Sequence, residues 1–122
     1  MLNKPMLFLA TSNPEKSRTF YENKLGLKFV SKDPYALVFD VGESELRIQV
    51  VGSVISGLYT SLGWKVNDLR KTIKELTSNG VEFESYENLK QDNYKIWQSP
   101  GGSKIAWFKD PDNNILSLTE HS

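Results

Sequence analysis

Cysteine is absent from the 122-residue chain, and histidine occurs once, as His121 next to the last residue. A chain without cysteine has no disulfide bond, no thiolate nucleophile and no cysteine-ligated metal. His121 lies where chain ends usually fray, with no cysteine and no suitably spaced carboxylate to complete a triad. The sequence therefore argues against the common cysteine- and histidine-based catalytic centres.

Net charge and long apolar runs are also missing. Fifteen basic residues balance fifteen acidic ones, which leaves no field to attract nucleic acid or an anionic membrane. The apolar run at residues 6–10 is too short for a signal peptide or a membrane span. Glycine-rich nucleotide motifs and the HExxH zinc motif are absent. We expect a cytoplasmic protein with neither nucleic acid nor membrane among its partners.

The chain contains an internal repeat. The stretch at residues 67–85 repeats the pattern at residues 13–31, which indicates two copies of one module. Each copy begins with an asparagine, whose side chain can cap a helix by accepting from N–H groups of the first turn. Each helix is closed by a glycine, which adopts a left-handed conformation without strain. The matching pairs include Asn13 with Asn67, Gly26 with Gly80 and Phe29 with Phe83.

Alternation of apolar residues and turn signals predict the remaining elements. Asn113, in a tight hairpin turn, is expected to have a positive φ. The first helix is expected to run to Lys24. We predict strands at residues 6–12, 28–31, 35–41, 45–51, 60–66, 81–84, 96–98, 104–109 and 115–119. The fold class is α+β, a single domain of two tandem β-α-β-β-β modules at about 5–51 and 59–120, joined by a connector at about 52–58.

Two such modules resemble the vicinal oxygen chelate superfamily, which includes glyoxalase I, extradiol dioxygenases, fosfomycin resistance enzymes and bleomycin resistance proteins. The resemblance spans essentially the whole chain. It implies curved mixed sheets around a central groove, helices on the outside, and pairing into a homodimer. The motifs that carry it are Phe20-Tyr21 followed by Leu25-Gly26-Leu27, and Phe108 followed by Asp110-Pro111-Asp112.

The resemblance also implies where the metal-dependent members bind a divalent ion. The corresponding positions are Met6, Arg47 or Gln49, Ser61 and Ser117. A thioether, two hydroxyls and an amide or guanidinium supply no anionic or imidazole donor. We therefore predict no metal, no other cofactor and no catalytic residue.

Strand alternation predicts which side chains line the groove. An apolar wall with a few polar groups is typical of small-molecule pockets. The resemblance implies that the strands of Trp97 and Trp107 border the groove mouth, where an indole offers a face for a planar or cationic ligand. Trp64 has the opposite parity and is expected to pack in the core. The predicted ligand-binding residues are Met6, Phe8, Arg47, Gln49, Ser61, Lys65, Trp97, Trp107 and Ser117.

The favoured function is metal-independent binding or sequestration of a small organic molecule. One alternative is a metal-dependent lyase or dioxygenase of the glyoxalase type. Another is a dimeric structural or regulatory domain whose groove is filled by its own side chains, with Arg47 paired to an acid and the tryptophans closing a sheet edge or a dimer contact.

Overall fold

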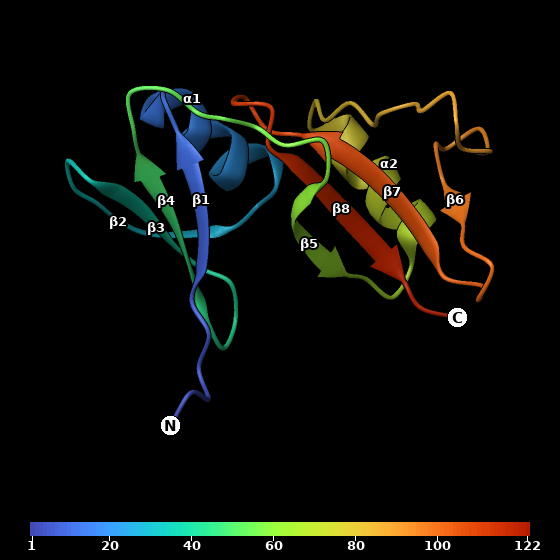
Figure 1. Ribbon diagram of the computed structural model, residues 1–122, viewed down its shortest axis with the longest axis horizontal. Coiled ribbons are helices and arrows are strands. Elements are labelled where there is room, and N and C mark those ends of the chain that lie inside the picture. The colour runs from blue at the N-terminus through green and yellow to red at the C-terminus, as the bar shows by residue number, and fades with distance from the viewer. The chain divides into compact units, whose positions relative to one another are not determined.

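The protein, analysed as a computed structural model, is described over all 122 residues and divides into two compact units. Unit 1 comprises Met1–Ser56 with Asp110–Asn114, and unit 2 comprises Gly57–Lys109 with Ile115–Ser122. Each unit holds one four-stranded mixed sheet and one helical segment, in the order β-α-β-β-β along the chain (Figure 1). The predicted α+β fold class is confirmed, although the turn Asp110–Asn114 belongs to unit 1 and not to the second module.

The sheet of unit 1 has the strand order β1-β4-β3-β2, with β1 parallel to β4 and the other pairs antiparallel. Alternate residues point to one buried face, as period-two patterning requires. The core on this face includes Leu9, Leu37, Phe39, Leu46 and Ile48. The strands are β1 (Leu7–Thr11), β2 (Lys28–Lys32), β3 (Ala36–Asp40) and β4 (Glu45–Val50).

The helical segment of unit 1 differs from the predicted single α-helix. The α-helix α1 (Pro14–Thr19) begins as expected, because the Asn13 side chain accepts from the Lys16 N–H at 3.1 Å. It then widens into a π-helical turn, η1 (Phe20–Lys24), in which the Leu25 N–H donates to the Phe20 carbonyl at 3.0 Å. The extra residue of a π-turn changes which side chains point toward the core. Here the consecutive residues Phe20 and Tyr21 are both buried.

A buried polar network joins this helical segment to the turn Asp110–Asn114. The Tyr21 hydroxyl, fully buried, donates to Asp110 Oδ2 at 2.6 Å. Asp110 also accepts from the Asn114 side chain at 2.8 Å and from the backbone N–H groups of Asp112 and Asn114, each at 2.9 Å. The Asn114 amide in turn donates to the Ala10 carbonyl of β1 at 3.0 Å. The network therefore connects the two motifs that carry the family resemblance.

Burial sets the ionisation of this pair. Desolvation raises the pKa of the Tyr21 hydroxyl well above its ordinary value, and the neighbouring Asp110 carboxylate adds to the shift. Desolvation also raises the pKa of Asp110, although the hydrogen bonds from Tyr21 and Asn114 oppose that shift. Four donors converge on the Asp110 carboxylate, and each would lose its partner if that side chain were removed.

The sheet of unit 2 has the equivalent strand order β5-β8-β7-β6, with β5 parallel to β8. Helix α2 (Leu69–Ser78) covers one face (Figure 1), and its Leu69 and Ile73 are buried. The sheet contributes Ala106, Phe108, Leu116 and Leu118 to the buried core. The strands are β5 (Thr60–Lys65), β6 (Trp97–Gln98), β7 (Lys104–Lys109) and β8 (Ile115–Glu120).

Three predicted details of unit 2 are wrong. Asp68, and not Asn67, caps α2 by accepting from the Lys71 N–H at 3.1 Å. Residues 81–84 form no strand, because their pairing with β7 is limited to an isolated bridge between Phe83 and Phe108. The strand predicted at residues 96–98 is shorter, at Trp97–Gln98.

The left-handed positions agree with the sequence. Gly26 and Gly80 follow the two helical segments with φ of 74° and 96°, and Asn113 has φ of 65°. Across the structure, no helix combines the length and the apolar character needed to cross a lipid bilayer.

Candidate functional site: the aromatic face of unit 2

The face of the unit 2 sheet opposite α2 presents two rows of side chains. Glu120 marks the helix side, since its carboxylate accepts from the Leu69 N–H of α2 at 2.9 Å. Thr119 and Ser117 are one and three positions away from Glu120 along β8, so they point to the opposite face. The strand register places Gly63, Ser117 and Trp107 in one row, and Lys65, Thr119, Ile105 and Trp97 in the next.

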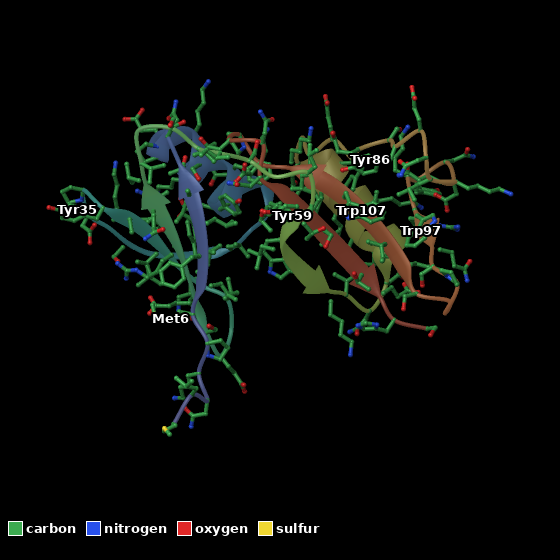
Figure 2. The ribbon with its side chains drawn as sticks, viewed as in Figure 1. Met6, Tyr35, Tyr59, Tyr86, Trp97 and Trp107 are labelled. Carbon is green, nitrogen blue, oxygen red and sulfur yellow. The ribbon has the colours of Figure 1, made fainter.

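Aromatic side chains dominate this face. The Trp97 and Trp107 rings lie 6.1 Å apart at a tilt of 36°, and the Tyr86 ring meets Trp107 edge-on at 5.6 Å (Figure 2). We call Trp97, Trp107 and Tyr86 the aromatic face. All three side chains are partly exposed, so their ring surfaces remain available to a ligand. Because aromatic side chains have few rotatable bonds, this surface is ordered before anything binds.

A cavity of about 310 Å³ opens beside the aromatic face. Trp107 and Tyr86 form part of its wall, and Tyr59 provides a third ring. The polar groups in reach are few: the Thr60 hydroxyl, the Asn88 amide and the tyrosine hydroxyls. The complete lining is Leu58, Tyr59, Thr60, Tyr86, Asn88, Leu89, Trp107 and Ile115. Small-molecule pockets have this combination of apolar walls and a few polar groups.

The pKa of the Tyr86 hydroxyl is raised above its ordinary value of 10.0, so this group is neutral at pH 7. Partial burial, and then the nearby Glu84 carboxylate, raise the pKa of Tyr86 above its ordinary value. Glu84 itself contacts Lys109 Nζ at 3.5 Å, and its backbone N–H donates to the Trp107 carbonyl at 2.8 Å. This link holds the segment that carries Tyr86 against β7. At neutral pH the cavity therefore contains a phenol that can donate a hydrogen bond.

Gly63 is required at its place beside Ser117. A Cβ on Gly63 would lie 2.6 Å from Ser117 Oγ and 3.3 Å from the Ser117 carbonyl oxygen. Both distances are shorter than ordinary carbon–oxygen contacts, so a side chain at this position would displace Ser117. The absence of a side chain at Gly63 therefore leaves room for the Ser117 hydroxyl, and Ser117 is in register with Trp107.

Of the two β5 residues predicted to bind a ligand, Lys65 has the expected strand register and Ser61 does not. Lys65 lies in register with Thr119 on the open face, as strand alternation predicts. Ser61 falls at a shift in register, because Thr60 pairs with Ile115 while Leu62 already pairs with Leu116. Gly63, and not Ser61, is consequently the β5 residue opposite Ser117. Trp64 pairs with the buried Leu118 on the helix side, as the sequence predicts.

Unit 1 places its predicted residues on the open face of its own sheet. Phe8 of β1 lies in register with Arg47 of β4, while Gln49 lies between Ala10 and Ala36. Phe8 is 52% exposed, and Met6, at 44%, precedes β1 (Figure 2). Arg47 reaches Glu45 at 4.0 Å, a long contact between partly exposed groups that contributes little.

The predicted ligand-binding residues include neither Tyr86 nor Tyr59, although both line the cavity. Both lie in irregular segments, where no alternation predicts the direction of a side chain. The available signal was apolar and aromatic content alone: Tyr59 follows Leu58 directly, and Tyr86 precedes Leu89 by three residues.

The residues at the positions implied for a metal do not fit one. Unit 1 offers the Met6 thioether and either Arg47 or Gln49, and unit 2 offers the hydroxyls of Ser61 and Ser117. Divalent ions in proteins are held by imidazole, thiolate or carboxylate groups. The structure gathers no group of three or more His, Cys, Asp or Glu side chains that could hold an ion.

The two four-stranded mixed sheets, each with its helical segment, have the architecture of the glyoxalase fold. The chain belongs to the Glyoxalase/Bleomycin resistance protein/Dioxygenase superfamily, whose model matches residues 5–118. No curated protein sequence matches the chain.

Solved structures share the fold at low identity. A superfamily member from Sphaerobacter thermophilus DSM 20745 is 24% identical, with a TM-score of 0.77 and coverage of 99% of this chain and 98% of that one. A glyoxalase family protein from Bacillus anthracis is 17% identical (TM-score 0.76; coverage 100% and 97%). A lactoylglutathione lyase from Agrobacterium tumefaciens is also 17% identical (TM-score 0.76; coverage 98% and 94%). At these identities the likeness establishes the fold alone.

Proposed function

We propose that this chain binds or sequesters a small, planar organic molecule without a metal, and that the aromatic face of unit 2 with its cavity is the binding surface. The observation that carries the proposal is the pair of partly exposed indoles, Trp97 and Trp107, beside a cavity of about 310 Å³. Stacking of a planar group on an exposed ring contributes about 1–3 kcal/mol. Together the two rings can therefore hold a small ligand.

The polar groups around the cavity support a neutral ligand. Thr60, Asn88 and Tyr86 offer hydroxyl and amide groups, and no charged side chain lines the cavity. These groups can orient a ligand by hydrogen bonds without requiring a formal charge on it. A neutral heteroaromatic compound with a few polar substituents fits this chemistry best.

The donor set is the reason to prefer binding over metal-dependent catalysis. The lyase and dioxygenase alternatives need ligands for a divalent ion, and the implied positions supply a thioether, hydroxyls and an amide or guanidinium. A divalent ion would lose more hydration there than these groups restore. A binding function needs none of these ligands, because occupancy of the site is itself the effect.

Tryptophan fluorescence tests the proposal. The protein is titrated with a panel of neutral planar heteroaromatic compounds while its emission is followed. We expect at least one compound to quench the emission, and Trp107→Ala or Trp97→Ala to weaken its affinity by about tenfold, since one stacked ring contributes about 1–3 kcal/mol. Trp64→Phe is the matched control, because Trp64 lies on the helix side of the same sheet.

Two results would contradict the proposal. One is the absence of binding across the panel. The other is binding that survives both alanine substitutions while Trp64→Phe removes it, which would place the ligand elsewhere. Elemental analysis of the purified protein gives an independent check, since a stoichiometric divalent metal would refute metal independence.

A further inference from the structure

A second cleft, of about 670 Å³, lies in unit 2 between the C-terminal half of α2, the segment at residues 81–83 and the loop at residues 93–95. None of its lining residues lines the cavity beside the aromatic face. Its floor is apolar, formed by Ile73, Val81 and Phe83. This cleft is therefore separate from the proposed binding surface and has its own chemistry.

Positive charge gathers around one ring of this cleft. The Arg70 guanidinium carbon lies 4.8 Å from the centre of the Tyr94 ring, and Lys74 Nζ lies 5.6 Å from it. Lys95 lines the cleft next to Tyr94. The ion pairs of the structure involve other basic residues, so these three cations have no carboxylate partner, and the Lys95 ammonium donates one hydrogen bond, to the Ser85 hydroxyl at 2.6 Å. Glu82 is the single acidic residue of the lining.

Lys95 adopts a backbone conformation that lysine rarely takes, with φ of 67°. The loop holds it there: Asp92 Oδ1 accepts from the N–H groups of Tyr94 at 2.8 Å and Ile96 at 3.0 Å, and the Gln91 amide donates to the Lys95 carbonyl at 2.8 Å. Glycine or asparagine would take this conformation with less strain. Strain of this kind is often retained where a side chain serves a function.

We propose that this basic cleft, defined by Lys74, Lys95 and Tyr94 over the floor of Ile73, Val81 and Phe83, binds small aromatic carboxylates. The carboxylate accepts hydrogen bonds from the Lys74 and Lys95 ammonium groups, which are stronger than neutral ones because both partners are charged. The flat apolar body lies on the floor and against the Tyr94 ring. The Arg70 guanidinium, 4.8 Å from the centre of that ring, adds positive charge.

The lining of the cleft favours an aromatic carboxylate over other anions. A nucleic acid needs a long basic track, which a neutral chain with a single small cluster does not offer. Inorganic phosphate gains nothing from the three apolar floor residues. An aromatic carboxylate uses both the charge and the floor, so it is the occupant that the lining favours.

The test uses 2-naphthoate as the probe and 2-naphthalenemethanol, its neutral analogue, as the comparison. Amide chemical shifts of the full-length protein are followed by NMR during titration of each compound. We expect naphthoate to shift Tyr94, Lys95 and the second half of α2, and to bind at least fivefold more tightly than the alcohol. Raising the salt concentration from about 20 to 300 mM should weaken naphthoate binding several-fold, because charge contacts at a surface cleft are screened.

Substitutions separate a binding role of Lys95 from a structural one. Lys95→Gly removes the ammonium and relieves the backbone strain, so it should raise the melting temperature while weakening naphthoate binding by about fivefold. Lys74→Gln should weaken binding to a similar extent with no change in melting temperature. Lys90→Gln is the matched control, because Lys90 is exposed on the preceding loop and does not line the cleft.

The proposal is overturned by any of three results. The first is that naphthoate causes no shifts, or shifts only the aromatic face. The second is that the alcohol shifts Tyr94 and Lys95 and binds at this cleft as tightly as naphthoate. The third is that Lys95→Gly leaves the affinity unchanged.

Discussion

The two units share one scaffold and differ in where their aromatic and polar side chains lie. In unit 1, Tyr21 and Asp110 are buried within a hydrogen-bond network, and the open sheet face carries Phe8 and Arg47. In unit 2, the helix has no such network, and the open face carries Trp97 and Trp107. The same fold therefore buries a polar network in unit 1 and exposes an aromatic face in unit 2.

The turns that end β3 and β7 show the difference at single-residue scale. Asp40, the last residue of β3, accepts one hydrogen bond, from the Gly42 N–H at 2.9 Å, and is not fully buried. Asp110, directly after β7, is 4% exposed and accepts four. An aspartate at a hairpin turn is common to both, and burial together with four converging donors distinguishes Asp110.

Replacing Asp110 should have the largest effect. Asp110→Ala leaves the Tyr21 hydroxyl, the Asn114 amide and two backbone N–H groups without their acceptor, which we expect to lower the free energy of unfolding by about 3–5 kcal/mol. Asp40→Ala, the control, should lower it by less than about 1 kcal/mol. Urea unfolding followed by circular dichroism measures both. Equal losses in the two variants would show that the Asp110 hydrogen-bond network contributes no more stability than the single hydrogen bond of Asp40.

Tyr21→Phe should have a smaller effect that depends on pH. Loss of the hydroxyl should lower the free energy of unfolding by about 1–3 kcal/mol at pH 7, since it leaves Asp110 short of one donor. The folded-state pKa of Tyr21 is raised above its ordinary value of 10.0, so the stabilisation is complete below that pH. Above it, only the unfolded chain loses the proton, and the wild type should lose up to about 1.4 kcal/mol per pH unit.

The matched measurement compares the two proteins at about pH 9 and pH 11. The difference in their free energies of unfolding should shrink at the higher pH, because Tyr21→Phe removes the titrating group. A constant difference across this range would show that the Tyr21 pKa is not raised in the folded state.

Gly63→Ala tests the packing of the aromatic face of unit 2. The new Cβ would crowd Ser117 Oγ, and we expect the free energy of unfolding to fall by about 1–3 kcal/mol. In the Gly63→Ala, Ser117→Ala double variant the hydroxyl is gone, so much of this loss should be recovered. A double-mutant cycle from urea unfolding measures the coupling. If the two effects simply add, Ser117 does not lie against Gly63.

Substitutions at the N-terminal cap of α2 should have the smallest effect on the free energy of unfolding. They test whether the second helix is capped at the position that the repeat predicts. Asp68→Ala should lower the free energy of unfolding by about 1 kcal/mol, as a lost cap does. Asn67→Ala should change it by less than about 0.5 kcal/mol, because Asn67 is not the capping residue. The same urea assay distinguishes them. The reverse order would restore Asn67 as the cap that the repeat predicts.

Residues whose conformation is decided locally were predictable from the sequence. Asn13 caps its helix, and Gly26, Gly80 and Asn113 have positive φ, because capping and turns depend on neighbouring backbone. The repeat and the family motifs then led to the correct fold class. The prediction of the capping residue of the second helix was wrong, because Asn67 and Asp68 are adjacent and either side chain can accept from N–H groups of the first turn.

Features that depend on distant contacts were not predictable. The π-turn at Phe20–Lys24 buries two consecutive aromatic residues, and Tyr21 meets an aspartate far along the chain. The register shift at Ser61 is likewise settled by pairing with β8. Tyr86 joins the aromatic face from an irregular segment. The family resemblance pointed to Trp97 and Trp107 as candidate ligand contacts, which stays a prediction, but nothing in the sequence indicated the cavity that Trp107 lines.

The central claim is that the aromatic face of unit 2 binds a small molecule without help from a metal. The most direct measurement is calorimetric titration of a compound that quenches tryptophan emission, before and after exhaustive treatment of the protein with EDTA. The account predicts the same affinity in both states, and a loss of about tenfold in Trp107→Ala. Binding that disappears with EDTA and returns with a divalent ion would contradict it.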